Sequence, residues 1–228
     1  MANGILPRLQ LLLFAPKCWG CNSPIQARRD FCFSCRKEIL AALEKSGCLF
    51  RYEGAVRGLL TCLRGTAPQL AAAWCLSLLS RSGTLEQWRK MGFHSVVLAP
   101  QNDTDGKRGL ARLGRIIAAE LRIPLVQPFT KLGGRSQHGR SLGSRMDAAC
   151  FVRLSCRKAP QGKILLIDDV YTTGTTLDQC AYLLRKAGAS EVACFSMARQ
   201  PVPRFERKKG EPEQEGEEMD PLLLHLFV

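Results

Sequence analysis

The feature that most constrains this chain is the segment 163–176, in which an apolar run leads into two aspartates and a threonine-rich turn. Lys163–Ile167 is typical of a buried strand, and Thr175–Ala187 is typical of a helix that ends at Gly188. Strand and helix patterns also alternate from residue 94 onward, which predicts a parallel sheet with helices on its faces. Because open α/β sheets bind ligands at the carboxyl ends of their strands, we expect a binding site directly after this strand.

The turn after the strand has the composition of a phosphate site. Gly174 permits the sharp bend that points successive N–H groups inward, and the helix N-terminus that follows favours an anion. Four threonines can add hydroxyl donors: Thr172, Thr173, Thr175 and Thr176. Asp168 and Asp169 would repel a phosphate, so we expect them to face ribose hydroxyls or Mg²⁺. Taken singly, the aspartates could be a strand-end turn and the threonines helix caps, whereas their combination favours a phosphate monoester.

Four cysteines near the N-terminus are paired in the manner of metal ligands. Cys18-x-x-Cys21 and Cys32-x-x-Cys35 are separated by ten residues. Each pair bends tightly enough to place two sulfurs on one ion, so the two pairs predict a four-cysteine zinc site. Four thiolates leave no open coordination position, and the metal is therefore expected to be structural. Redox thiols or vestigial cysteines are the alternatives.

Net charge and hydropathy narrow the classes of function. The chain carries a formal net charge of +13, and residues 101–160 hold twelve Lys or Arg against four acidic residues. That excess suits phosphates, pyrophosphate or nucleic acid, and it does not distinguish a nucleotide from a polynucleotide. No P-loop motif occurs, so an ATPase has no support. The apolar runs fall well short of the roughly 20 residues of a membrane span and no signal peptide is evident, so we expect a cytoplasmic protein without membrane contact.

We expect three parts along the chain. Residues 1–47 form a zinc-finger module with a helix, residues 48–200 form the α/β domain, and residues 201–228 form a charged, disordered tail with an apolar end. Further helices are expected over Arg36–Lys45, stopping at Gly47, and over Leu110–Leu121, with a mainly helical region over 48–92. Further strands are expected over Ser95–Ala99, Leu125–Val126 and Glu191–Met197. A mobile loop is expected over 131–145.

Several of these segments resemble a known family. Residues 164–176 are similar to the signature with which type I phosphoribosyltransferases bind 5-phosphoribosyl-1-pyrophosphate (PRPP). The four cysteines and the segment 52–57, Tyr-Glu-Gly-Ala-Val-Arg, resemble the corresponding parts of the competence protein F (ComF) family. Arg135-Ser136-Gln137 and Arg145 resemble that family's R-x-x-x-Q…R stretch, with tighter spacing.

The resemblance implies a type I phosphoribosyltransferase-like fold and an enzyme that displaces pyrophosphate from C1 of PRPP with the help of Mg²⁺. Asp168 and Asp169 would be the catalytic residues. The residues implied for PRPP binding are Asp168, Asp169, Thr172, Thr173, Gly174, Thr175, Thr176, Arg135 and Arg145. Arg135 or Arg145, together with Mg²⁺, would neutralise the leaving pyrophosphate.

The family also implies a role in DNA uptake by naturally transformable bacteria, with protein partners in the uptake machinery. One alternative is a non-enzymatic competence factor that binds single-stranded DNA and keeps the fold, and another is a nucleobase-salvage phosphoribosyltransferase. Aromatic residues make up 7% of the chain and are not interleaved with the basic run, so stacking platforms for bases are not evident. The family's Arg-Gly-Phe-Asn-Gln reads Arg-Gly-Leu-Ala-Arg at 108–112, and the acceptor is therefore not identified.

Overall fold

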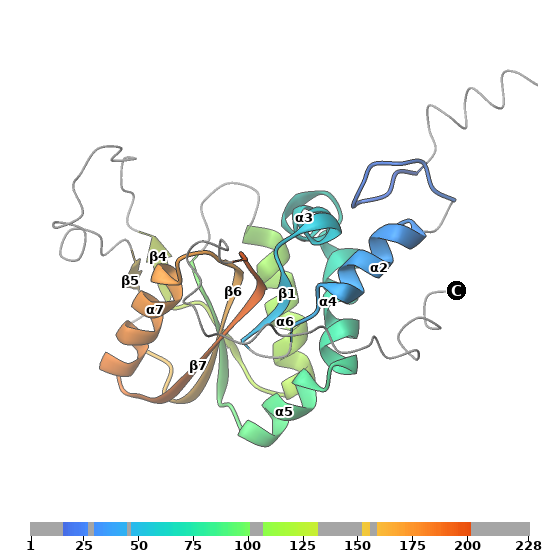
Figure 1. Ribbon diagram of the computed structural model, residues 1–228. Coiled ribbons are helices and arrows are strands. Elements are labelled where there is room, and N and C mark those ends of the chain that lie inside the picture. Colours follow the sequence, from blue (N-terminus) through green and yellow to red (C-terminus); the bar gives the residue numbers. More distant parts are fainter. Residues whose placement is uncertain are drawn as a thin grey trace, which may run out of the picture.

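The structure is a computed structural model that describes residues 16–26, 30–44, 47–100, 107–131, 152–155 and 159–201. Its centre is a five-stranded sheet with helices on both faces (Figure 1). In their order across the sheet, the strands are β1 (Cys48–Arg51), β7 (Ala189–Arg199), β6 (Gly162–Tyr171), β2 (Ser95–Leu98) and β3 (Leu125–Val126). Every pairing in this sheet is parallel, which confirms the predicted α/β class.

The remaining described elements are mostly helices. They are α2 (Phe33–Ala41), α3 (Gly54–Thr61), the π turn η1 (Cys62–Thr66), α4 (Pro68–Arg81), α5 (Thr84–Met91), α6 (Lys107–Leu121) and α7 (Thr175–Lys186). Two short strands, β4 (Phe129–Lys131) and β5 (Val152–Leu154), form a separate antiparallel pair. The strands predicted over 95–99, 125–126, 163–167 and 191–197 and the helices predicted over 110–121 and 175–187 are confirmed.

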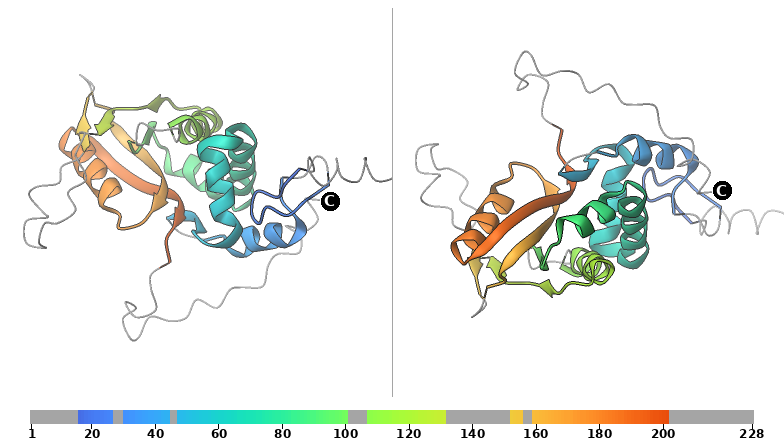
Figure 2. Two further views of the ribbon diagram at one scale, coloured as in Figure 1. Left: turned by 90° about the horizontal axis from the view of Figure 1, so that it is seen from above. Right: turned by 90° about the horizontal axis from the view of Figure 1, so that it is seen from below.

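The sheet separates two apolar cores, because successive side chains of a strand point to opposite faces. In β6, Ile164 and Leu166 pack in the core that contains α7, whereas Leu165 and Ile167 pack in the core that contains α4 and α6. Figure 2 shows α7 on one face of the sheet and these other helices on the opposite face. All four side chains are at most 1% exposed, and burying each contributes about 1.5–3 kcal/mol. The apolar run thus fixes β6 inside the sheet and leaves its polar end at the carboxyl edge.

The predicted helical region over 48–92 is wrong at its beginning, where Cys48–Arg51 forms β1. Leu49 and Phe50 are at most 1% exposed, and the segment pairs in parallel with β7, about 150 residues later in the chain. A local sequence pattern cannot indicate a pairing partner that lies so far along the chain. From Gly54 to Met91 the chain is helical as predicted, apart from the π turn and the short connections.

Two predicted boundaries also differ from the structure. Helix α2 ends at Ala41 rather than near Gly47, whose carbonyl instead accepts the N–H of Ser196 in β7 and so belongs to the start of β1. The acidic pair was expected after the strand, but β6 continues through both aspartates to Tyr171. The pairing of this strand with β7 extends past the end of the apolar run, so the polar residues keep strand geometry.

The N-terminal segment packs closely on the helical face of the domain. A Cβ at Gly58 in α3 would overlap the carbonyl oxygen of Trp19, and a Cβ at Gly20 would lie 2.6 Å from the Cys35 sulfur. Trp19, Phe31 and Trp74 form an edge-to-face aromatic stack that joins this segment to α4. Cys18 and Phe31 belong to the same apolar core as β6 and α6. The division into residues 1–47, 48–200 and 201–228 stays a prediction.

Several predicted features lie outside the described residues. They include Arg135 and Arg145, the predicted loop over 131–145 beyond its first residue, and all but the first residue of the predicted tail. Within the described ranges, none of the helices has the length and hydrophobicity that crossing a membrane requires.

Candidate functional site

The acidic pair lies at the carboxyl edge of the sheet, in the last part of β6. Asp168 is 8% exposed, and its Oδ1 accepts the N–H of Asp169 at 2.8 Å. Asp169 accepts the N–H of Val170 through Oδ1 at 2.7 Å and bonds to Arg64 through Oδ2 at 2.8 Å. The two carboxylates therefore have different environments, and that of Asp169 is balanced by a cation.

Arg64 reaches this edge from η1, 105 residues earlier in the chain. Its side chain is 39% exposed and that of Asp169 is 14% exposed, so the ion pair lies at the boundary of the core. Burial acts to lower the pKa of Arg64, but the charge of Asp169 and the hydrogen bonds to Asp169 and Tyr52 outweigh it and raise the pKa. The guanidinium is therefore held as a charged group between the acidic pair and the end of β1.

The threonine-rich turn connects β6 to α7 at the same edge. Gly174 has a φ of +80° and caps the N-terminus of α7, and a Cβ there would overlap the hydroxyl of Tyr171. Both the left-handed backbone and this close contact require glycine. Thr173 and Thr175 place their Oγ1 atoms 2.8 Å apart on the exposed side of the turn. Because the first N–H groups of a helix have no partner within the helix, the turn offers amide and hydroxyl donors together.

Two tyrosines and two arginines line the neighbouring strand ends. Arg199 in β7 lies opposite Tyr171 in β6, with its guanidinium carbon 5.2 Å from the centre of the tyrosine ring. Tyr52 follows β1 and donates its backbone N–H to the carbonyl of Arg199 at 2.7 Å. Arg57 of α3 lies over the Tyr52 ring at 5.6 Å. Cationic and aromatic side chains are thus paired in space near the ends of β1, β6 and β7, although they are dispersed in the sequence.

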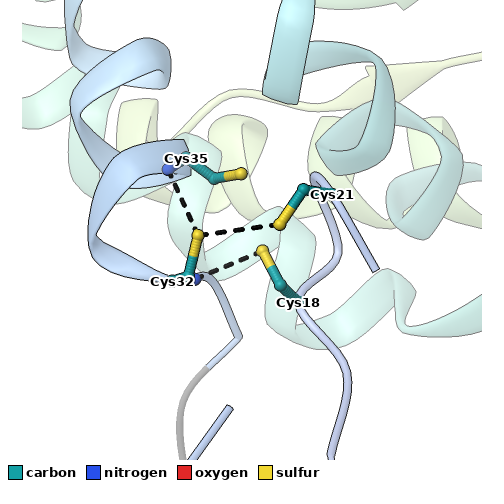
Figure 3. Close-up of side chains that lie close together, drawn as sticks. All are labelled: Cys18, Cys21, Cys32 and Cys35. Atoms are coloured by element: carbon teal, nitrogen blue, oxygen red, sulfur yellow. Dashed lines mark hydrogen bonds between the residues drawn. The ribbon is translucent and has the colours of Figure 1, made fainter. Parts of the chain in front are cut away.

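The four paired cysteines converge on one point, as their spacing predicts (Figure 3). Their Sγ atoms all lie within 4.8 Å of one another, and those of Cys21 and Cys32 are 3.7 Å apart. In a tetrahedral zinc site with Zn–S bonds of about 2.3 Å, sulfur atoms are about 3.8 Å apart. The cluster can therefore hold one metal ion.

Backbone and side-chain donors favour thiolates in this cluster. The N–H of Cys32 donates to Cys18 Sγ at 3.2 Å, and the N–H of Cys35 donates to Cys32 Sγ at 3.5 Å, because Cys32 caps the N-terminus of α2. Hydrogen bonds, first of all those with Ser23, lower the pKa of Cys21 to about 6. Burial raises the pKa of Cys35, as do the neighbouring thiols. Cys35 therefore favours the neutral thiol, and a bound metal ion would have to displace its proton.

Residues 109–214 match the family model of the phosphoribosyl transferase domain. This part of the chain is similar to the phosphoribosyl transferase domain. The match begins in α6 and includes β6, the acidic pair, the threonine-rich turn and β7. The predicted type I phosphoribosyltransferase-like fold is confirmed, with the four-cysteine cluster on its N-terminal side.

The chain is also related to competence proteins, which confirms the resemblance to the ComF family. Competence protein ComFC of Streptococcus pneumoniae is 26% identical over 151 residues, covering 66% of this chain and 66% of the relative. Competence protein ComFC of Bacillus subtilis is 30% identical over 108 residues, covering 47% of this chain and 45% of the relative. Among solved structures, the purine phosphoribosyltransferase of Pyrococcus horikoshii is 14% identical with a TM-score of 0.39, covering 61% of this chain and 95% of that chain. The chain thus spans about two thirds of the first ComFC and less than half of the second.

Most residues predicted to bind PRPP lie along one edge of the sheet. The strand contributes Asp168 and Asp169, and the turn and helix contribute Thr172, Thr173, Gly174, Thr175 and Thr176. Arg135 and Arg145 lie outside the described residues, and all nine roles stay predictions. Arg64, Tyr52 and Arg199 were not predicted, because the parallel pairing of β1 and β7 and the turn of η1 bring them to the edge. Of the three, Tyr52 alone lies in a segment that the sequence analysis had singled out, the one over 52–57 that resembles the ComF family.

Proposed function

We propose that this protein binds PRPP with Mg²⁺ at the carboxyl edge of the sheet and transfers the phosphoribosyl group to an acceptor. The observation that carries the proposal is the succession of groups at the end of β6. An acidic pair is followed by a bend at Gly174 and by hydroxyl and N–H donors at the start of α7. One ribose ring carries both hydroxyls, which suit the carboxylates, and a 5′-phosphate, which suits the donors.

The proposed reaction breaks the bond between C1 of the ribose and the pyrophosphate oxygen. Positive charge then develops on the ribose ring, and the carboxylates of Asp168 and Asp169 stabilise it electrostatically. The threonine-rich turn holds the 5′-phosphate and so fixes the distance of C1 from the acidic pair. The pyrophosphate leaves with the electron pair of the broken bond, and its charge must be neutralised by cations.

Magnesium fits the chemistry of this edge. Carboxylate oxygens are preferred Mg²⁺ ligands, and Asp168 and Asp169 are the residues that would hold the ion, directly or through water. When bound, the ion neutralises charge on the leaving pyrophosphate. One oxygen of Asp169 also bonds to Arg64.

We further propose that the metal held by the four cysteines is zinc and that its role is structural. Four sulfur ligands complete a tetrahedral shell, which leaves no position for a substrate or water. Elemental analysis of the purified protein should give about one zinc per chain.

The proposed PRPP site is tested by the double variant Asp168→Asn, Asp169→Asn. Asparagine keeps the size of the side chain and removes the charge that holds Mg²⁺, so PRPP binding should be lost while the fold is retained. Calorimetric titration with PRPP and Mg²⁺ measures the loss, and thermal unfolding monitors the fold. Asp178→Asn, an exposed aspartate in the first turn of α7, is the matched control. If the double variant binds PRPP as strongly as wild type does, the acidic pair has only a structural role.

A second candidate function is binding of single-stranded DNA in competence. The related proteins are named competence proteins, and the interleaved arginines and tyrosines at the sheet edge favour this function specifically. Successive bases stack on aromatic rings while cations contact the backbone phosphates. We propose a role in DNA uptake for either case, with the phosphoribosyl site as an active or an inherited pocket.

Titration of a labelled oligo-dT separates the two candidates. Tyr52→Ala should weaken binding by about 1–3 kcal/mol if the ring stacks on a base, and Tyr52→Phe should not. Tyr182→Ala is the control, since Tyr182 is an exposed tyrosine of α7 that also has a cation, Lys186, over its ring. Equal binding by Tyr52→Ala and wild type, together with a steep salt dependence, would indicate contacts to phosphate alone.

A further inference from the structure

Arg64 is the unexpected residue of the phosphoribosyl site. Its Nε donates to Asp169 Oδ2 at 2.8 Å, and its side chain also bonds to Tyr52. A guanidinium has five N–H donors, so these contacts leave others for a further partner. At 39% exposure the side chain is still accessible from the carboxyl edge of the sheet.

The backbone below Arg64 is fixed on two sides. The π turn is closed by the bond from the N–H of Ala67 to the carbonyl of Cys62 at 3.1 Å, and Cys62 and Leu63 are at most 5% exposed. Helix α6 packs directly against this backbone, since a Cβ at Gly109 would overlap the carbonyl oxygen of Leu63. Isolated π turns of this kind often occur at functional sites. The turn presents Arg64 toward β6 while its apolar neighbours anchor the segment in the core.

Charge at the edge indicates what Arg64 can bind. Its Nε neutralises Asp169, and the planar fork of its two terminal nitrogens matches the paired oxygens of a phosphate group. In the proposed function, the donors of the threonine-rich turn already bind the 5′-phosphate of a phosphoribosyl ligand. A second anionic group of the ligand, attached next to the ribose hydroxyls, would lie close to the acidic pair and therefore to Arg64.

We propose that Arg64 binds the pyrophosphate group of PRPP while its Nε stays on Asp169. This inference rests on the proposed function and deepens it. Arg64 then links the carboxylate beside the ribose to the anionic leaving group. It also makes the site selective for a ligand that carries a diphosphate on C1 over a simple ribose phosphate.

The competing explanation is that Arg64 serves only as a counter-ion of Asp169. The two explanations predict opposite results when the charge is removed. Without a pyrophosphate contact, Arg64→Gln would free Asp169, and binding of PRPP with Mg²⁺ would be unchanged or tighter. With a pyrophosphate contact, the same change removes charge-assisted hydrogen bonds to the ligand, and binding weakens.

The experiment is a calorimetric titration of wild type and Arg64→Gln with three probes in Mg²⁺ buffer: PRPP, inorganic pyrophosphate and ribose 5-phosphate. Arg64→Gln should bind PRPP and pyrophosphate about 10- to 100-fold more weakly and ribose 5-phosphate within about twofold of wild type. Arg89→Gln is the matched control, because Arg89 is similarly exposed and also pairs with a carboxylate, that of Glu120. Arg64→Lys keeps the charge without the planar fork and should give an intermediate loss, which keeps the test valid if Arg64→Gln does not fold.

The outcomes distinguish the inference from the proposed function. If wild type binds PRPP and ribose 5-phosphate and Arg64→Gln binds PRPP equally well, Arg64 is a counter-ion and the inference is wrong while the proposed function stands. If wild type binds none of the three probes, both are wrong. A selective loss of PRPP and pyrophosphate binding supports the inference.

Discussion

The cysteine cluster and the acidic edge of the sheet are assembled in opposite ways. The four thiols come from a segment of 18 residues, 18–35, and their spacing alone predicts that they converge. The acidic edge combines the end of β6 with Arg64, 105 residues earlier, and with Tyr52 at the end of β1. The first site is defined by local sequence, and the second exists only when the sheet and the π turn are in place.

This difference predicts which substitutions should disrupt each site. Loss of its own ligands should abolish the cysteine cluster, whereas the acidic edge should also respond to changes in the packing of distant helices. The two sites nevertheless share one apolar core, since Cys18, Cys35 and Leu63 belong to it together. Three variants test this difference between the two sites.

The largest effect is expected for the double variant Cys18→Ser, Cys35→Ser. Both thiols are at most 3% exposed, so the change removes two of the four proposed metal ligands and places polar hydroxyls in the shared core. We expect loss of zinc and destabilisation by more than about 4 kcal/mol, measured by metal analysis and urea unfolding. Cys194→Ser, at an exposed cysteine, should change neither quantity. Full zinc content in the double variant would show that the metal is held elsewhere.

A smaller effect is expected for Gly109→Ala, which tests whether packing controls the acidic edge. The new Cβ would overlap the carbonyl of Leu63, so α6 or η1 must shift and Arg64 must move with it. We expect about 3 kcal/mol of destabilisation together with weaker PRPP binding. Gly65→Ala is the matched control, because no atom lies within 4 Å of a Cβ at that position of the same turn. Unchanged PRPP binding in a destabilised Gly109→Ala protein would show that the acidic edge does not depend on the packing of α6 against η1.

The smallest effect is expected for Thr173→Val, which tests the local part of the proposed phosphate site. The change removes one hydroxyl, while Thr175 Oγ1, 2.8 Å away, and the backbone N–H groups stay. PRPP binding should weaken by about 1 kcal/mol in calorimetry, with thermal stability unchanged. Thr84→Val, at the start of α5 and far from this edge in sequence, provides the control. A loss as large as that caused by the aspartate variants would show that hydroxyls rather than amides hold the phosphate.

Local pattern predicted the elements that are long and apolar, and it predicted the cysteine cluster. The strand over 163–167, the helix after Gly174 and the convergence of the thiols all follow from residues close in sequence. β1 was missed because Cys48–Arg51 is only four residues long and becomes a strand through pairing with β7. Arg64 was missed for a related reason, since its partner Asp169 is brought to it by the packing of α6 against η1. What sequence pattern lacks here is the set of contacts between distant segments.

The pairing of β1 with β7 has a consequence for the order of events during synthesis. Cys48 lies opposite Ser196, so the ribosome must produce almost the entire domain before β1 finds its neighbour. Until then Leu49 and Phe50, which end at most 1% exposed, have no sheet to join. Chains emerge N-terminus first at about 5–20 residues per second, so this wait lasts on the order of 10 s. A metal ion bound by the cysteine pairs during that interval would keep the start of the chain folded until the last strand is made.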